Sequence, residues 1–466
     1  MRPEIKEYNF DWMLWTIMDT GYKAALGTEK EFSRVLGYAP YFSGIIGSIA
    51  NQGEPGVTFL KLAAKYYENI VKVHERGKKL ALTTFCFSPA ILYAMDAVPV
   101  TLEVLTAFAG LTWKRGAFDY LDYSVERGFT ETACSSQRGS LGAYMAGLGS
   151  EIDFIVVDTA GICDTNANAF AFASAYLDKP FYQLNFPAGL TDERTKDYHR
   201  DDYKALITFL EEQTGNKLDE DKLREVLKEL NRQDEMLGEL EEMQRLVPSP
   251  LPGAFNLFIY AGRFMFAGWP EYTELLKAMV KVVRQNVEDG VTGIRSGREK
   301  CRALFFYIDH FTLNLRLWRW LDQHEISHIG GILSRFFSDN VPYTQGREEE
   351  AYRIETGNLD TMIDSIAEMN ARMPMVRSIR GPYDAPYMWL DDALTLGKLY
   401  SADCMIYNGT PGCRNTWSNV KLIAKDLENN GYPTHIMYAD AFDDRVESWE
   451  ATSERLGEFF QLRRLV

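Results

Sequence analysis

The pattern of apolar and polar residues divides the chain into helical stretches and stretches that mix strands with helices. Residues 1–78 carry aromatic and aliphatic side chains at helical spacing, for example around Trp12 and Trp15. Residues 192–297 are strongly charged at first, and the apolar residues between Leu223 and Leu230 again recur three or four positions apart. Such a period predicts helices. We therefore expect a helical N-terminal region over 1–78 and a helical segment over 192–297.

Between these helical parts, short apolar runs end at turn-forming residues. They predict strands at 79–86, 153–158 and 181–185, with a helix from about Asn166 to Leu177 between the last two. Strand, helix and strand at this spacing are typical of the βαβ unit of a parallel sheet. We place a first α/β domain at 79–191.

The last third of the chain repeats this mixture and predicts a second α/β domain at 298–466. Helices are expected at 313–322 and 418–429. The expected strands are 303–308, 328–333, 405–407 and 435–438. The predicted fold class is therefore α/β, with two Rossmann-like (flavodoxin-like) parallel-sheet domains and helical N-terminal and middle additions.

Composition and charge narrow the class of protein. The 466 residues are 46% hydrophobic and 25% charged, as in a globular protein, and their formal net charge is −16. So acidic a chain repels nucleic acid and anionic lipid, so we expect neither as a partner. No apolar run reaches the roughly 18 residues of a membrane span, and the charged N-terminus does not resemble a signal peptide. We expect a cytoplasmic protein whose six cysteines are reduced thiols or metal ligands.

Several common functional motifs are absent from the sequence. It has no Gly-x-x-x-x-Gly-Lys-Ser/Thr loop and no Gly-x-Gly-x-x-Gly after a strand, which disfavours ATP hydrolysis and nicotinamide binding by this chain. It has no Gly-x-Ser-x-Gly and no Cys-x-x-Cys either, and its His-Glu-x-x-His run at 324–328 spans the predicted end of a helix and the start of a strand instead of lying on one helix. Cysteines that bind a metal here must therefore come together from distant parts of the fold.

Three cysteines have the setting that such a site needs. Cys163 lies between a predicted strand and a predicted helix, and Cys413 lies in the same position in the second α/β domain. Cys134 also precedes a predicted helix. Ligands bind at the carboxyl ends of parallel strands, and the N–H groups of a helix start suit an anionic iron–sulfur cluster. These residues are candidate ligands.

The alternative for each cysteine is a small buried side chain of the core. For Cys301 and Cys404, each at the start of a strand, we expect that role. His324 and His328 are four residues apart, but they span the end of a helix and the start of a strand, so we expect packing or surface roles. The sequence does not single out a catalytic base.

The order of motifs resembles the 2-hydroxyacyl-CoA dehydratase and benzoyl-CoA reductase family. The run Phe87-Ser-Pro-Ala-Ile-Leu-Tyr-Ala-Met-Asp-Ala-Val-Pro-Val100 is similar to a segment near the start of that family. Further segments follow in the family's order: Cys134-Ser135, 153–164 with Cys163, Cys413-Arg414 and 431–460. The resemblance covers about residues 70 to 466.

The resemblance implies one [4Fe-4S] cluster bound through three separated cysteines, which correspond to Cys134, Cys163 and Cys413. It also implies pairing with a related subunit as a heterodimer, and a dimeric iron–sulfur ATPase activator that delivers single electrons. In the dehydratases, an acyl-CoA thioester loses water through a ketyl radical, and the reductases reduce an aromatic ring instead. We expect an oxygen-sensitive enzyme of anaerobic metabolism, a lyase of the dehydratase type, with the aromatic acyl-CoA reductase as the alternative.

Two features leave alternatives open. The segment 87–100 has Ala90 where the family often has Glu, which leaves the substrate open. Cys86 lies at a strand end where some family members carry a thiol, so it is a further candidate ligand. A fourth thiolate would turn a substrate-binding cluster into an electron relay, whereas an open iron acts as a Lewis acid. A zinc site on the same thiolates and a non-catalytic two-domain protein that binds a small ligand are the remaining alternatives.

Overall fold

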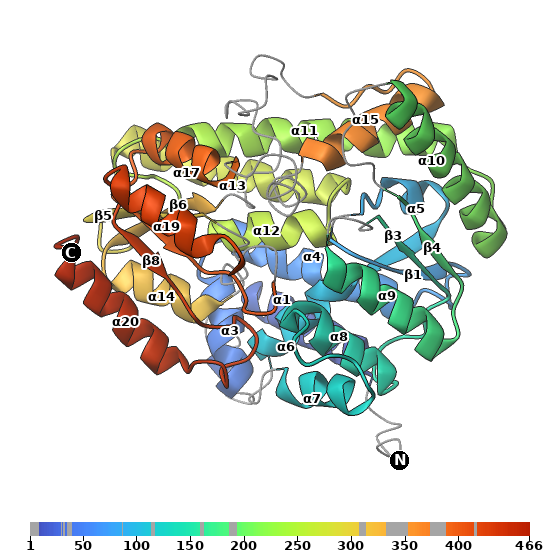
Figure 1. The fold of residues 1–466 in the computed structure, drawn as a ribbon, viewed down its shortest axis with the longest axis horizontal. Coiled ribbons are helices and arrows are strands. Elements are labelled where there is room, and N and C mark those ends of the chain that lie inside the picture. Colours follow the sequence, from blue (N-terminus) through green and yellow to red (C-terminus); the bar gives the residue numbers. More distant parts are fainter. Residues whose placement is uncertain are drawn as a thin grey trace. The chain divides into compact units, whose positions relative to one another are not determined.

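The computed structural model folds into two compact units, each assembled from segments that are separate in the sequence (Figure 1). Unit 1 comprises Met1–Asn231, Gly262–Leu275 and Ile354–Ala371, and unit 2 comprises Arg232–Ala261, Leu276–Arg353 and Arg372–Val466. The structure describes residues 9–28, 30, 33–34, 40–85, 87–112, 117–158, 163–185, 193–306, 314–331, 353–372, 388–413 and 417–466.

Unit 1 contains a parallel sheet in the order β2-β1-β3-β4. Its strands are β1 (Lys79–Thr83), β2 (Ala97–Thr101), β3 (Phe154–Val157) and β4 (Phe181–Gln183). All four residues of β3 are buried, as expected for a strand that is covered on both faces. Strand β2 lies on one side of β1, and β3 and β4 follow on the other side. The direction in which successive strands are added therefore reverses between β1 and β3. In open α/β sheets, this reversal marks the place where ligands bind.

Helices of unit 1 pack around this sheet and against each other. The N-terminal helices are α1 (Phe10–Ala25), α3 (Pro40–Ala50) and α4 (Glu54–Val71), which confirms helical structure in the described part of 1–78. Phe10, Leu14 and Met18 form a fully buried stripe along α1, which packs on α4. The other helices of this unit are α5 (Ala90–Ala94), α6 (Leu102–Thr112), α7 (Phe118–Glu126), α8 (Ser135–Met145), α9 (Asp164–Leu177), α10 (Glu193–Thr214) and α15 (Leu359–Arg372).

Unit 2 repeats the topology of the first sheet, with parallel strands in the order β6-β5-β7-β8. The strands are β5 (Cys301–Phe305), β6 (Ile326–Gly331), β7 (Cys404–Tyr407) and β8 (Thr434–Ile436). Helices α14, α17 and α19 contact β6, β5 and β8, respectively. The helices of this unit are α14 (Leu315–Gln323), α17 (Met388–Leu399), α19 (Val420–Asn429) and α20 (Trp449–Leu462).

The predicted middle helical segment is also present. Its helices α11 (Glu220–Gln244), α12 (Phe255–Met265) and α13 (Pro270–Asp289) each run from one unit into the other, so the segment does not form a body of its own. The domain boundaries at 78, 191 and 297 stay a prediction. Among the described residues, no helix has the length and apolar character that crossing a membrane requires.

The α/β fold class with two parallel sheets is confirmed, and the element bounds differ by a few residues from the prediction. Helix α9 begins at Asp164 rather than Asn166, directly after Cys163. Strand β6 begins at Ile326, two residues before the predicted start, and Glu325 makes the preceding turn with a φ of 63°. The predicted ends of the strands at 86, 308 and 333 lie outside the described residues.

Candidate functional site

The carboxyl ends of three neighbouring strands in unit 1 carry buried polar residues. Thr84 directly follows β1, Glu103 lies two residues after β2, and Asp158 directly follows β3. Glu103 is 6% exposed, and Thr84 and Asp158 are 1% exposed. Burying a carboxyl group costs free energy, and the packing of a core does not require one. Buried carboxyl groups at the ligand-binding edge of a parallel sheet are therefore functional candidates.

Three groups donate hydrogen bonds to the Glu103 carboxylate. The Thr84 hydroxyl donates to Oε1 at 2.8 Å, and the backbone N–H of Phe85 donates to Oε2 at 3.2 Å. The side-chain amide of Gln137 donates to Oε1 at 3.3 Å. These bonds fix the carboxylate between the end of β1 and the first turn of α8.

Burial controls the protonation of both carboxyl groups. It raises the pKa of Glu103 to about 7, although the hydrogen bonds to the carboxylate act in the opposite direction. Burial also raises the pKa of Asp158 to about 7, and the charge of Glu103 adds to this increase. A carboxyl group with a pKa near neutrality exchanges protons readily at physiological pH, as a general acid–base catalyst must.

Cys163 is connected to Glu103 through Asn166. Cys163 is the N-cap residue of α9, and its Sγ accepts a hydrogen bond from the backbone N–H of Asn166 at 3.4 Å. The side chain of Asn166 donates to the Thr84 hydroxyl at 2.8 Å, and Thr84 in turn donates to Glu103. A cysteine at a helix start is stabilised as the thiolate, which is the form that binds metals.

Cys134 occupies the equivalent position on the neighbouring helix. It is the N-cap residue of α8, and Gln137 in the first turn of that helix donates to Glu103. Helices α8 and α9 contact each other, and Figure 1 shows them side by side. Both cysteines therefore begin helices whose first turns are tied to the same buried carboxylate.

Small residues hold α8 close to its neighbours. A Cβ at Gly139 would come within 2.7 Å of the Thr106 side chain on α6, and a Cβ at Gly142 within 1.9 Å of the Tyr120 carbonyl oxygen on α7. Thr106 also exchanges hydrogen bonds with Ser140: the Thr106 backbone N–H donates to Oγ at 2.8 Å, and the Ser140 backbone N–H donates to Oγ1 at 2.7 Å. This packing fixes the start of α8, and with it Cys134.

The buried cluster has unused hydrogen-bonding capacity. Within the described part of the chain, Gln137 Oε1, Asn166 Oδ1 and Thr83 Oγ1 are buried and make no hydrogen bond. Buried polar atoms usually have a partner, and exceptions point to a bound ligand or water. The edge of this sheet is therefore built to receive a polar group.

Cys413 lies in unit 2 at the position that Cys163 has in unit 1. It follows β7, the third strand of its sheet, as Cys163 follows β3. The Cys413 backbone N–H donates to the Thr410 carbonyl oxygen at 3.0 Å, and the Thr410 hydroxyl donates to buried Asp440 at 2.5 Å. The indole N–H of Trp417 donates to the same carbonyl oxygen at 2.7 Å. The loop that carries Cys413 is thus rigidly held.

The donor set fits an iron–sulfur cluster in its chemistry. Cys163 and Cys413 follow the strands β3 and β7, and Cys134 and Cys163 are the N-cap residues of α8 and α9. Cysteine thiolates are the usual ligands of iron–sulfur clusters. Within the described ranges, no group of three His, Cys, Asp or Glu residues is already gathered as a metal site. Cys134 and Cys163 belong to unit 1 and Cys413 belongs to unit 2, and the convergence of the three thiols stays a prediction. Cys86 lies outside the described residues.

Cys301, Cys404, His324 and His328 have the core and packing roles that we expected. Cys301 and Cys404 are fully buried on neighbouring strands, with their Sγ atoms 3.9 Å apart. His328 is buried and stacks on Phe305 with the ring centroids 4.0 Å apart, while His324 stacks on Trp320.

Sequence reasoning did not identify Glu103 or the residues that bind it. One signal was available, because Glu103 is the one charged residue in the run from Val98 to Leu105, which is apolar apart from Thr101 and lies at the end of a strand. Its side-chain partners Thr84 and Gln137, and Asn166, which donates to Thr84, are polar residues of ordinary types, and only the fold brings them together.

Two α/β units, each with a four-stranded parallel sheet, and a buried acid of raised pKa at the carboxyl edge of one sheet are typical of an α/β enzyme. Residues 84–462 match the family model of the 2-hydroxyglutaryl-CoA dehydratase D-component, so the chain belongs to this family. The family predicted from the order of motifs is thereby confirmed.

Curated relatives agree with this assignment. The chain is 25% identical to the (R)-2-hydroxyisocaproyl-CoA dehydratase alpha subunit of Clostridioides difficile over 55% of this chain and 64% of the relative. It is 25% identical to the lactoyl-CoA dehydratase subunit alpha of Anaerotignum propionicum over 82% of this chain and 91% of the relative. It is 24% identical to the (R)-phenyllactyl-CoA dehydratase alpha subunit of Clostridium sporogenes over 50% of this chain and 59% of the relative.

Proposed function

We propose that this chain is the [4Fe-4S]-containing subunit of an enzyme that eliminates water from a 2-hydroxyacyl-CoA. The observation that carries the proposal is the buried Glu103, tied by hydrogen bonds to the first turns of two helices that begin at Cys134 and Cys163. A redox-active metal site and a proton-transfer group would then act at one sheet edge.

Cys134, Cys163 and Cys413 are the residues that would hold the cluster. Such a cluster would supply one-electron redox chemistry at the thioester. The backbone N–H groups at the starts of α8 and α9 would stabilise its negative charge, because the positive ends of the helix dipoles point toward it. Held by these three thiolates, the cluster would also supply Lewis-acid chemistry to a substrate oxygen.

Glu103 would move the proton of the reaction. Elimination breaks the Cα–O and Cβ–H bonds of the substrate and forms a carbon–carbon double bond, and the proton and the hydroxide combine as water. Ionised Glu103 accepts the proton, and its protonated form donates a proton to the leaving hydroxide. Its pKa of about 7 suits both directions. Thr84 and Gln137 orient the carboxylate.

The relatives favour the dehydratase over the aromatic-ring reductase, because all three are named dehydratase subunits. Since they are named alpha subunits, we propose that this chain also pairs with a second subunit. A separate ATP-hydrolysing activator is consistent with the absence of a phosphate-binding loop from this sequence.

The activity is tested on the full chain purified without oxygen together with its partner subunit. Acyl-CoA thioesters of lactate, 2-hydroxyisocaproate and phenyllactate are offered with ATP and the activator, and mass spectrometry follows the loss of one water. We expect conversion of at least one thioester, dependent on ATP and abolished by air. Conversion of none of them by a complex that contains its iron would reject the dehydratase assignment.

A further inference from the structure

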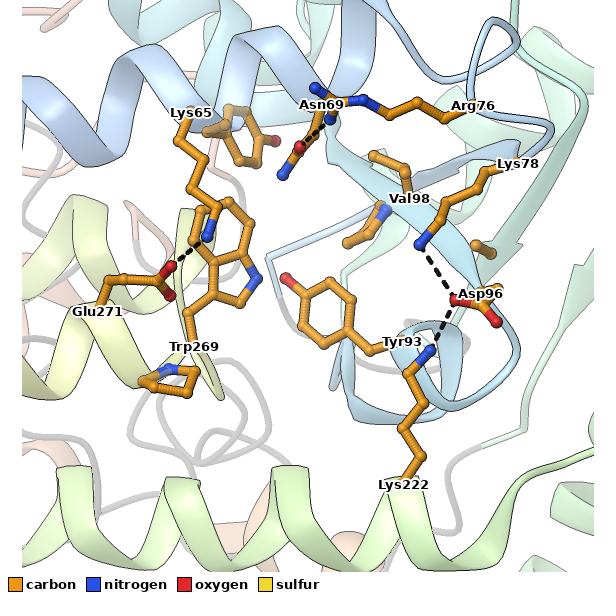
Figure 2. A pocket seen from close by; sticks show the side chains of 14 residues that line it. Lys65, Asn69, Arg76, Lys78, Tyr93, Asp96, Val98, Lys222, Trp269 and Glu271 are labelled. Atoms are coloured by element: carbon orange, nitrogen blue, oxygen red, sulfur yellow. Dashed lines mark hydrogen bonds and ion pairs between the residues drawn. The ribbon is translucent and has the colours of Figure 1, made fainter.

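A second candidate site lies in unit 1 at the opposite end of the sheet. It is a pocket of about 270 Å³ that opens beside the amino ends of β1 and β2 (Figure 2). Lys78 and Asp96 directly precede these strands, whereas Thr84 and Glu103 follow them. Five residues of extended strand span about 16 Å, so the pocket is separate from the Glu103 cluster.

The charge of this pocket contrasts with that of the chain. Four cationic side chains line it, against the two carboxylates Asp96 and Glu271, although the whole chain has a formal charge of −16. The four cations are Lys65, Arg76, Lys78 and Lys222. An excess of positive charge in a concave site attracts small anions.

Asp96 holds two of these cations together. Its carboxylate accepts hydrogen bonds from Lys78 at 3.0 Å and from Lys222 at 2.7 Å, and Figure 2 shows both ammonium groups directed at it. The side chains are 41%, 51% and 37% exposed for Lys78, Asp96 and Lys222, so these ion pairs are weak and exchangeable. Asp96 is therefore placed where a bound anionic oxygen would lie.

Flat and apolar surface adjoins these charges. Trp269 and Tyr93 line the pocket with their ring centroids 6.4 Å apart, and Val98 and Pro99 of the edge strand β2 complete the apolar surface. The ammonium group of Lys65 lies 5.1 Å from the centroid of Trp269. Aromatic faces beside cationic groups suit a ligand with a flat ring and an anionic group.

We propose that this pocket binds a purine nucleoside phosphate, with the ring against Trp269 and the phosphate between Lys78 and Lys222 in place of the Asp96 carboxylate. The volume suits a nucleoside rather than a large cofactor, since sites for drug-sized ligands begin at about 300 Å³. This chemistry has two sources: a free adenine nucleotide, or the phosphorylated adenosine end of coenzyme A, and the second source rests on the proposed function. The proposal does not depend on the iron–sulfur cluster.

Asp96 supplies the sharpest variant because it competes with the ligand. Its φ of 57° is a left-handed backbone conformation that Asn tolerates well, so Asp96→Asn removes the charge and preserves the turn. A residue with only a structural role would not improve binding when its charge is lost. For Lys222→Glu, the matched control is Lys228→Glu on the same helix, because Lys228 is similarly exposed and does not line the pocket.

The test is isothermal titration calorimetry of the full chain with ADP, coenzyme A, adenosine and inorganic phosphate. We expect ADP to bind, with about three- to fivefold tighter binding to Asp96→Asn and about tenfold weaker binding to Lys222→Glu. Lys228→Glu should match the wild type. Circular dichroism melts are used to check that each variant is folded.

Each result of the titrations either supports or overturns the proposal. Competition between coenzyme A and ADP supports the proposal with the coenzyme as a source, and binding of ADP alone supports it with the free nucleotide as the source. The proposal is overturned if ADP does not bind, if inorganic phosphate binds as tightly as ADP, or if Asp96→Asn weakens binding while folded.

Discussion

At the scale of single residues, Glu103 combines a cost to stability with the proton-transfer role that we propose for it. Its carboxyl group is 6% exposed, and burial raises its pKa to about 7 despite three donated hydrogen bonds. A protein gains no stability from an ionised carboxylate in such a place. A buried acid of raised pKa beside candidate metal ligands is instead typical of catalytic sites.

Replacing Glu103 by Gln should separate the two effects. We expect the rate of dehydration to fall by about 10²–10⁴-fold, because the amide cannot exchange a proton. The free energy of unfolding at pH 8 should change little, because the amide avoids a buried charge and keeps an acceptor for Thr84, which offsets the lost acceptor for the Phe85 N–H. Urea denaturation and the dehydration assay measure both. A loss of stability that matches the loss of rate would contradict a catalytic role.

The pH dependence of stability has a defined sign. The folded-state pKa of Glu103 is raised above its ordinary 4.5, so the native protein binds the proton more tightly than the unfolded chain does. The free energy of unfolding should therefore decrease as the pH rises from about 4.5 to 7, by an amount on the order of 3 kcal/mol for this residue. Urea midpoints across this range should show a shallower decrease for Glu103→Gln than for the wild type.

At the scale of elements, α8 is positioned by residues that lack bulk. Gly142→Ala should destabilise the protein by about 1–3 kcal/mol, because its Cβ would lie 1.9 Å from the Tyr120 carbonyl oxygen. Gly238→Ala on α11 is the matched control: nothing lies within 4 Å, so it should stabilise the helix by about 0.5–1 kcal/mol. Equal effects of the two changes in thermal melts would contradict the packing described for α8.

The sequence predicts these elements to different degrees. The strands around Leu80, Ile155 and Ile406 were predicted because their apolar runs are short and are bounded by turn-forming residues. The start of α9 was predicted two residues late, because a Cys as N-cap residue lacks the usual signal of Ser, Thr, Asp or Asn. Local sequence patterns therefore predict the positions of strands and helices, and they misplace an element boundary where an unusual residue such as Cys163 is the N-cap residue.

At the scale of the whole molecule, the sequence predicts two α/β units but not which segments of the chain make up each unit. Unit 1 takes in residues 262–275 and 354–371 from later in the chain, and contacts such as Asn231 with Ile354 join them. Likewise, Glu103 meets Gln137 and Asn166 meets Thr84 only in the folded sheet. Long-range contacts of this kind leave no local period in the sequence.

The most direct test of the account is the iron and acid-labile sulfide content of the chain after purification without oxygen, with a visible spectrum. We compare the wild type with Cys134→Ala, Cys163→Ala and Cys413→Ala, and use Cys404→Ala as the control because that thiol is buried within β7. The account predicts about four iron and four sulfide per chain in the wild type and the control, and their loss from the other three variants. Neither iron nor sulfide in the wild type after reconstitution, or full iron in the three variants, would contradict it.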